Sequence, residues 1–174
     1  MTKTTFKFTS ENIVNNKIFA DLLKSNKIKD FKKLSSNEQN CIIDIINLQS
    51  LVSADSSLSN YELIFDSNFK ASKFSADSIT YQTASLISRD NRLKRVLHIY
   101  SSCKKNTVKM HICCSSSEVA RAYFSSLNNA SIKTSKKTTV LYSNDFTECF
   151  DNILLALSVL NNVDSTYSVL RSSK

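Results

Sequence analysis

The sequence predicts an α+β domain: two N-terminal helices, an antiparallel meander of about four strands, and a C-terminal α-β-α segment that completes a mixed sheet. Three observations predict this class. Apolar residues recur at helical spacing from residue 10 to residue 51. They alternate with polar residues at the strand period between residues 61 and 113. After residue 115 a helical pattern, a short apolar strand and another helical pattern follow one another.

Two helices are expected at the N-terminus. Residues 10–25 carry an amphipathic stripe, and Ser10 can cap the helix. Residues 36–51 carry a second stripe, opened by a capping box of Ser36 and Gln39.

Linker signals divide the chain. A basic connector spans residues 24–33, and the Ser-rich stretch 53–60 is the strongest boundary signal. We therefore expect an N-terminal helical segment over 1–56 and an α+β domain over 57–174. One continuous domain over 1–174 is the alternative.

The meander is expected to contain strands over residues 61–66, 79–88, 92–100 and 107–113. Asp90–Asn91 suits a tight hairpin, and the polar loop 101–106 joins the last two strands. The last strand has the clearest alternation. One face carries Val108, Met110 and Ile112, and the other carries Thr107, Lys109, His111 and Cys113. One face of the sheet should therefore be packed and the other exposed to water.

The C-terminal segment should start with a helix over 115–128, capped by Ser115 and Glu118. A strand over 138–143 follows, and Asp145 with Glu148 opens the last helix. Because strand 107–113, this helix and strand 138–143 resemble a βαβ unit, we expect strand 138–143 to join the sheet in parallel.

Composition narrows the function classes. The chain lacks Gly, Pro and Trp, whereas about 12 Gly and about 9 Pro would be average for its length. All codons for these residues contain GG or CC, which indicates an AT-rich genome, such as that of a virus. Asn must then supply the left-handed backbone at helix ends, and Asn128–Asn129 and Asn161–Asn162 are placed to do so. Nucleotide-binding loops and nucleophile elbows require Gly, so we expect a non-catalytic protein without a cofactor.

Five cysteines, an odd number, match no disulfide framework and indicate a reducing compartment. The N-terminus is polar, and no apolar run approaches the roughly 18 residues that span a bilayer. We expect an intracellular, cytoplasmic protein without a membrane partner, with the nucleus as the alternative location.

The net charge of +8 is unevenly distributed. Residues 1–33 hold eight Lys against three acids, residues 34–66 hold five acids and no base, and residues 67–137 hold thirteen bases against three acids. Two basic blocks around an acidic one favour an acidic partner such as nucleic acid. A solvated surface without a partner is the alternative.

The candidate site is the polar face of the hairpin over 92–113. It contains Arg92, Lys94, Arg95, His98, Tyr100, Lys104, Lys105, Lys109 and His111. Cations can bind phosphates, and flat rings can stack on bases, which is what a sheet needs to hold a single strand. The basic loop 133–137 could add phosphate contacts.

Two other chemistries are weaker. Cys114 precedes a helix and could be an activated thiol, with Arg121 downstream, but the loop lacks the spacing and the Gly of a thiol-enzyme anion loop. Cys103, Cys113, Cys114, His98 and His111 lie close in sequence without a C-x-x-C pair, so no metal site is expected.

These observations lead to one hypothesis and one alternative. The hypothesis is a small, basic, non-catalytic protein that binds nucleic acid, single-stranded or RNA. The alternative is a protein–protein interaction module, such as a host-factor antagonist, an inhibitor or an assembly subunit, with self-association to a homo-oligomer included.

Overall fold

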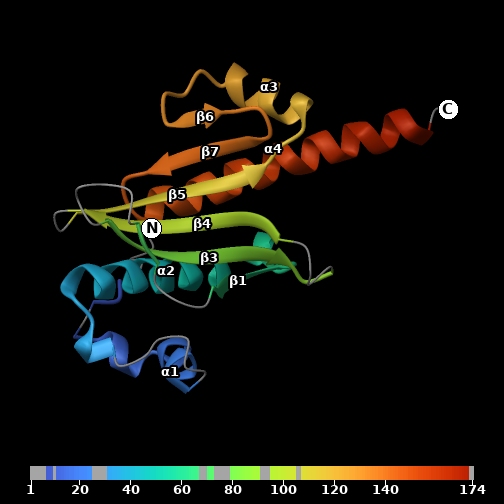
Figure 1. The fold of residues 1–174 in the computed structure, drawn as a ribbon. Coiled ribbons are helices and arrows are strands. Elements are labelled where there is room, and N and C mark those ends of the chain that lie inside the picture. The colour runs from blue at the N-terminus through green and yellow to red at the C-terminus, as the bar shows by residue number, and fades with distance from the viewer. Residues whose placement is uncertain are drawn as a thin grey trace, which may run out of the picture.

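The computed structural model describes residues 7–9, 11–24, 31–66, 70–72, 79–90, 95–104 and 107–172. Their centre is one sheet in which every pair of neighbouring strands is antiparallel, in the order β1-β3-β4-β5-β7-β6, with β2 paired to β3 (Figure 1). The strands are β1 (Tyr61–Phe65), β2 (Lys70–Ser72), β3 (Ile79–Ser88), β4 (Arg95–Lys104), β5 (Thr107–Ser115), β6 (Ile132–Thr134) and β7 (Thr138–Ser143).

Two long helices, α2 (Ser36–Ala54) and α4 (Phe146–Ser172), lie beside each other on one face of the sheet (Figure 1). Helix α3 (Glu118–Ser126) packs on α4 and on strands β6 and β7. The remaining helical elements are η1 (Ile13–Asn15), α1 (Lys17–Lys24), η2 (Phe31–Lys33) and η3 (Ser56–Leu58). No helix in the described part of the chain has the length and apolar character that crossing a bilayer requires.

The alternation of β5 decides which face is packed. Met110, Ile112 and Cys114 are buried against the helices, whereas Lys109 is exposed and His111 half-buried. Apolar residues of α2, α4 and the sheet form one hydrophobic cluster, which also includes Phe19 and Phe31 from the N-terminal part. The protein therefore has a helix-covered face and a second face that no helix of the described residues covers (Figure 1).

The α+β class and the predicted strands of the meander are confirmed. The prediction of a mixed sheet is wrong, because β7 is antiparallel to β5. The helical connection does lead to a strand that runs parallel to β5, but that strand is the short β6, which the sequence pattern did not reveal. The chain then reverses at residues 135–137, and β7 inserts between β5 and β6 in the opposite direction.

Several helix boundaries and capping residues differ from those predicted, because other side chains form the capping hydrogen bonds. The predicted helix 10–25 is interrupted at Asn16, whose backbone is extended and whose side-chain oxygen accepts a hydrogen bond from Phe19 N at 3.0 Å. Helix α2 starts at Ser36 as predicted and continues to Ala54, but its capping box is formed by Ser35 and Glu38 rather than by Ser36 and Gln39. Helix α3 is capped by Ser117, so strand β5 continues to Ser115.

The loop predicted over 101–106 is shorter, because β4 extends to Lys104, paired with Thr107 of β5. The predicted cap of the last helix is confirmed by a 2.8 Å bond from Glu148 N to Asp145 Oδ1.

The two Asn pairs behave differently. Asn128 follows α3 with a φ of 52°, so Asn does take the left-handed position that Gly usually occupies. Helix α4 does not end at Asn161–Asn162 but continues to Ser172. An Asn inside a helix costs less than about 1 kcal/mol, which is too little to stop a helix that Gly or Pro does not interrupt.

Candidate nucleic-acid interface

The uncovered face of the sheet gathers polar and aromatic side chains from four neighbouring strands. Strand pairing places Ser85 of β3 beside His98 of β4. It also places Tyr100 of β4 beside His111 of β5, and His111 beside Tyr142 of β7. Because side chains alternate along each strand, these residues all lie on the face opposite α2 and α4.

Four rings form a continuous row across this face. The ring centroids of His98 and Tyr100 are 4.4 Å apart, and those of Tyr100 and His111 are 4.6 Å apart with planes only 9° from parallel. The row continues from His111 to Tyr142, at 5.6 Å and 39°. Cross-strand aromatic pairs of this kind stabilise a sheet and fix its register.

A carboxylate holds the β4 end of the row. Asp66, directly after β1, accepts a hydrogen bond from Ser85 Oγ at 2.9 Å, and its other oxygen lies 3.0 Å from His98 Nε2. Both the His98 and Asp66 side chains are largely buried. The Asp66 carboxylate therefore fixes the orientation of the His98 imidazole, which in turn packs against the ring of Tyr100.

The opposite end of the row is exposed and basic. Tyr142 is 45% exposed, and Lys133 Nζ of β6 lies 5.8 Å from the centroid of its ring. On β5, Lys109 Nζ donates a hydrogen bond to Asn144 Oδ1 at 3.1 Å. A cavity of about 410 Å³ opens here, lined by Ser102, Lys109, Met110, His111, Ser131, Tyr142, Ser143 and Asn144.

Electrostatics leave His111 uncharged at neutral pH. Burial lowers the pKa of His111, and the neighbouring His98 lowers it further. Above its pKa the ring is a neutral aromatic surface beside Tyr100 and Tyr142. At this end of the row, therefore, the charge that an anion would meet comes from Lys109 and Lys133 rather than from His111.

The structure brings together four of the nine residues in the predicted site: His98, Tyr100, Lys109 and His111. Arg95 and Lys104 lie at the two ends of β4, and Arg92, Lys94 and Lys105 lie outside the described residues. The hairpin register that the hypothesis required is therefore present, with Tyr100 opposite His111 and Ser102 opposite Lys109.

Sequence reasoning missed Tyr142 at one end of the ring row, and the flanking groups Lys133 and Asp66. Tyr142 alternates with buried Leu141 in β7, which marks it as a residue of the polar face, but the expected parallel strand gave it no place beside His111. Lys133 was assigned only to a basic loop, and it lies in β6. Asp66 is separated from His98 by 32 residues, so no local pattern could pair them.

Cys113 and Cys114, the candidates for thiol and metal chemistry, lie on opposite faces of the sheet. Cys114 faces the core, where burial raises its pKa to about 11, so that it is a protonated thiol at neutral pH. Cys113, on the other face, is half-buried, and its pKa is also raised by burial. Among the described residues, no three His, Cys, Asp or Glu side chains are grouped so that they could hold a metal ion.

Comparisons with known proteins give no family. Neither the family models, nor the curated proteins, nor the solved structures include a significant match to this chain. Functional inference therefore depends on the chemistry of the face itself.

Proposed function

We propose that this chain is a small, basic, non-catalytic protein that binds single-stranded nucleic acid, with RNA as the expected form, on the uncovered face of its sheet. The observation that carries the proposal is the ring row, which ends in exposed Tyr142 near Lys133, beside a cavity that Lys109 also lines. Rings on an open sheet take up unstacked bases, and lysines beside them neutralise the phosphates between those bases.

The ring geometry indicates where a base can stack. Tyr100 and His111 are nearly parallel, so each covers one face of the other. His111 and Tyr142 are tilted apart by 39°, and both line the 410 Å³ cavity. A base can therefore reach a ring face most easily at Tyr142, while the rest of the row supports that ring.

The cavity supplies hydrogen-bonding groups beside that ring. The side chains of Ser102, Ser131 and Asn144 line it together with Lys109. Hydroxyl and amide groups can bond to base edges or to ribose hydroxyls, whereas the ammonium group suits a phosphate. This set favours a flexible single strand, because a duplex keeps its base faces stacked and inaccessible.

The decisive experiment measures binding of the full chain to labelled single- and double-stranded RNA and DNA, at low and at physiological salt. Micromolar or tighter binding to single strands that persists at physiological salt is the expected result. Binding to no nucleic acid, or binding that disappears at physiological salt, would reject the proposal. The net charge of +8 would then be a property of the solvated surface without a nucleic-acid partner.

A second candidate function, self-association, is favoured by a separate observation. Helix α3 and its C-cap residue Leu127 expose an apolar stripe at helical spacing, with Val119, Tyr123 and Leu127 exposed by 61%, 47% and 37%. On the predicted helix 10–25, by contrast, Leu23 is the one large hydrophobic residue that is exposed among the side chains described there. Sedimentation over a range of concentrations tests this candidate: a dimer that Val119→Ser with Tyr123→Ser converts to a monomer would support it.

A further inference from the structure

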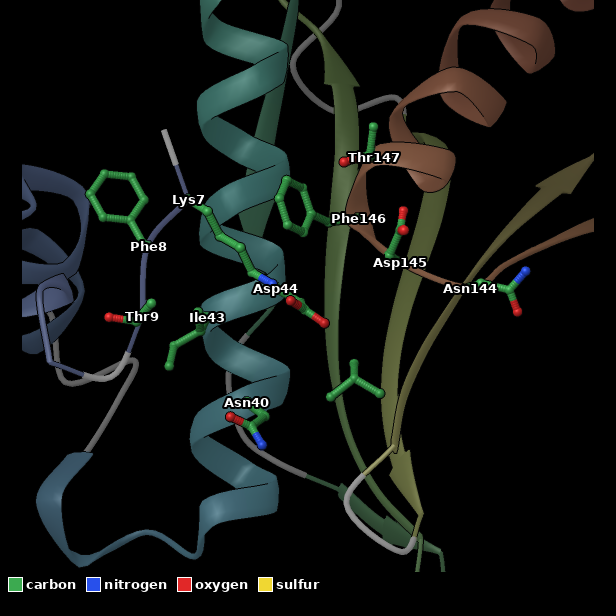
Figure 2. Close-up of a pocket in the computed structure, with 11 residues that line it drawn as sticks. Lys7, Phe8, Thr9, Asn40, Ile43, Asp44, Asn144, Asp145, Phe146 and Thr147 are labelled. Atoms are coloured by element: carbon green, nitrogen blue, oxygen red, sulfur yellow. The ribbon is translucent and has the colours of Figure 1, made fainter. Parts of the chain in front are cut away.

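A second cavity lies on the helix-covered side of the sheet, and Asn144 lines both this cavity and the one beside the ring row. Its volume is about 610 Å³, within the range of small-molecule sites. It is formed by residues 7–9, one side of α2, Val108 of β5 and residues 144–147 at the start of α4 (Figure 2). Four segments that are distant in sequence therefore meet around it.

The N-terminal wall of this cavity is held in place by Asn47. This buried side chain accepts a hydrogen bond from Phe8 N at 2.7 Å and donates one to Phe8 O at 3.2 Å. The amide thus bonds to both backbone groups of one residue, which fixes segment 7–9 against α2. A wall fixed by two long-range bonds indicates that the cavity is a preformed feature of the fold.

The lining combines charged and apolar side chains. Lys7, Asp44 and Asp145 surround the opening, and the ring of Phe146 faces the Lys7 side chain (Figure 2). Lys7 Nζ lies 6.0 Å from the centroid of that ring, so this ring face already accommodates an ammonium group. Ile43 and Val108 add apolar surface to the lining.

The charges of the cavity are unbalanced. Two carboxylates face one ammonium group, and Asp145 is occupied as the cap of α4. Asp44 is half-buried, and no cation of the described residues lies within ion-pair distance of its carboxylate. Lys7 acts on this carboxylate from beyond ion-pair distance, so the cost of burying the charge is only partly offset, and an incoming cation would reduce it further.

We propose that this cavity binds a small organic cation, namely a primary amine that carries an apolar group. Its ammonium group pairs with the Asp44 carboxylate and lies near the Phe146 ring. Its apolar group packs on Ile43 and Val108. The carboxylates of Asp44 and Asp145 repel anionic ligands. An uncharged ligand cannot form the ion pair with Asp44 and should bind more weakly than the amine.

The test uses three probes of similar shape on the full chain: phenethylamine, its neutral analogue 2-phenylethanol, and the anion phenylacetate. Isothermal titration at pH 7.5 should show that phenethylamine binds at least about tenfold more tightly than the other two, as a charge-assisted hydrogen bond predicts. Chemical shifts of the wild-type protein should change around Asn40, Ile43, Asp44 and Thr147, whose positions line the cavity.

Two variants separate this site from general surface charge. Asp44→Asn, which keeps the size of the side chain, should remove the preference for the amine. Asp151→Asn changes an exposed acid of α4 outside the cavity lining and should leave that preference intact. Equal affinity for the three probes, shift changes confined to other residues, or an unchanged preference in folded Asp44→Asn would each overturn the proposal.

Discussion

Tyr100 and His111 face each other across strands β4 and β5, with ring centroids 4.6 Å apart and ring planes within 9° of parallel. This pair links the two strands of the hairpin on which the candidate site was predicted. It also connects His98, held by Asp66, to exposed Tyr142.

Replacing Tyr142 by Ala should weaken binding to single-stranded RNA about tenfold or more, because a stacked base contributes about 1–3 kcal/mol. Tyr123→Ala is the matched control, since that ring on α3 is 47% exposed against 45% for Tyr142. Fluorescence anisotropy with a labelled oligonucleotide measures both. Equal losses in the two variants would show that the ring row is not the binding surface.

Lys109→Gln should flatten the dependence of binding on salt. A lysine that neutralises one phosphate of a single strand contributes about 0.7 to the slope of log affinity against log salt concentration. Lys24→Gln, at an exposed site on α1, removes the same charge away from the sheet. If both variants change the slope equally, the effect is one of net charge and Lys109 makes no phosphate contact.

Cys113 should be the first thiol to react with iodoacetamide in the native protein. It is half-buried, whereas Cys41, Cys103, Cys114 and Cys149 are buried. Its pKa is raised by burial, so the reaction should be slow at pH 7 and accelerate as pH rises. Because Cys113 pairs with His98 on the uncovered face, bound single-stranded RNA should slow the reaction further. Mass spectrometry of peptides identifies the labelled site, and early labelling of a buried thiol would contradict the assignment.

Asn128→Ala should destabilise the protein by about 1 kcal/mol, because a side chain with a β-carbon is strained at φ 52° and Ala lacks the local hydrogen bonding that helps Asn there. Asn128→Gly should be neutral or slightly stabilising, since Gly adopts this conformation without strain. Urea denaturation of the two variants measures the difference. An Ala variant as stable as the Gly variant would show that the positive φ at residue 128 does not strain a residue with a β-carbon.

Asp44→Asn should stabilise the unliganded protein at pH 7 but not below pH 3.8. Burial raises the pKa of Asp44 from 3.8 to about 6; Lys7 lowers it and Asp145 raises it further. Between these pH values the unfolded chain loses the proton while the folded protein retains it, so stability falls as pH rises through this window. The gain at pH 7 should be on the order of 1–3 kcal/mol.

Denaturation at pH 3.5, 5 and 7 tests this dependence, with exposed Asp151→Asn as the control. A gain that does not change with pH would mean that the Asp44 carboxylate is not the cause.

Local patterns predicted the elements well where they depend on neighbours in sequence. The alternation of residues 107–113 identified β5 and the correct face of each side chain, because a strand on one packed face must place apolar residues at every second position. The Asp145–Glu148 cap was predicted for the same reason, since its hydrogen bond spans only three residues. The charge blocks and the lack of Gly were likewise visible without a structure.

Short elements and long-range pairings could not be predicted in this way. Strand β6 has three residues, which is too short for a periodic signal, and missing it reversed the expected direction of β7. Tyr142 was consequently absent from the predicted site, as was Asp66. The 610 Å³ cavity joins residues 7–9, α2 and the start of α4, and no sequence window contains all three.

The sequence by itself determined the α+β class, the meander with its polar face, the Asn at the end of α3 and the basic balance of the chain. Each follows from side-chain periodicity, backbone preference or charge, which act over a few residues. The tertiary structure alone decided that β7 lies antiparallel beside β5, that the ring row ends at Tyr142, and that α2 and α4 cover only one face of the sheet. These features depend on which apolar surfaces pack together, and packing selects among strand orders and directions that local patterns leave equally allowed.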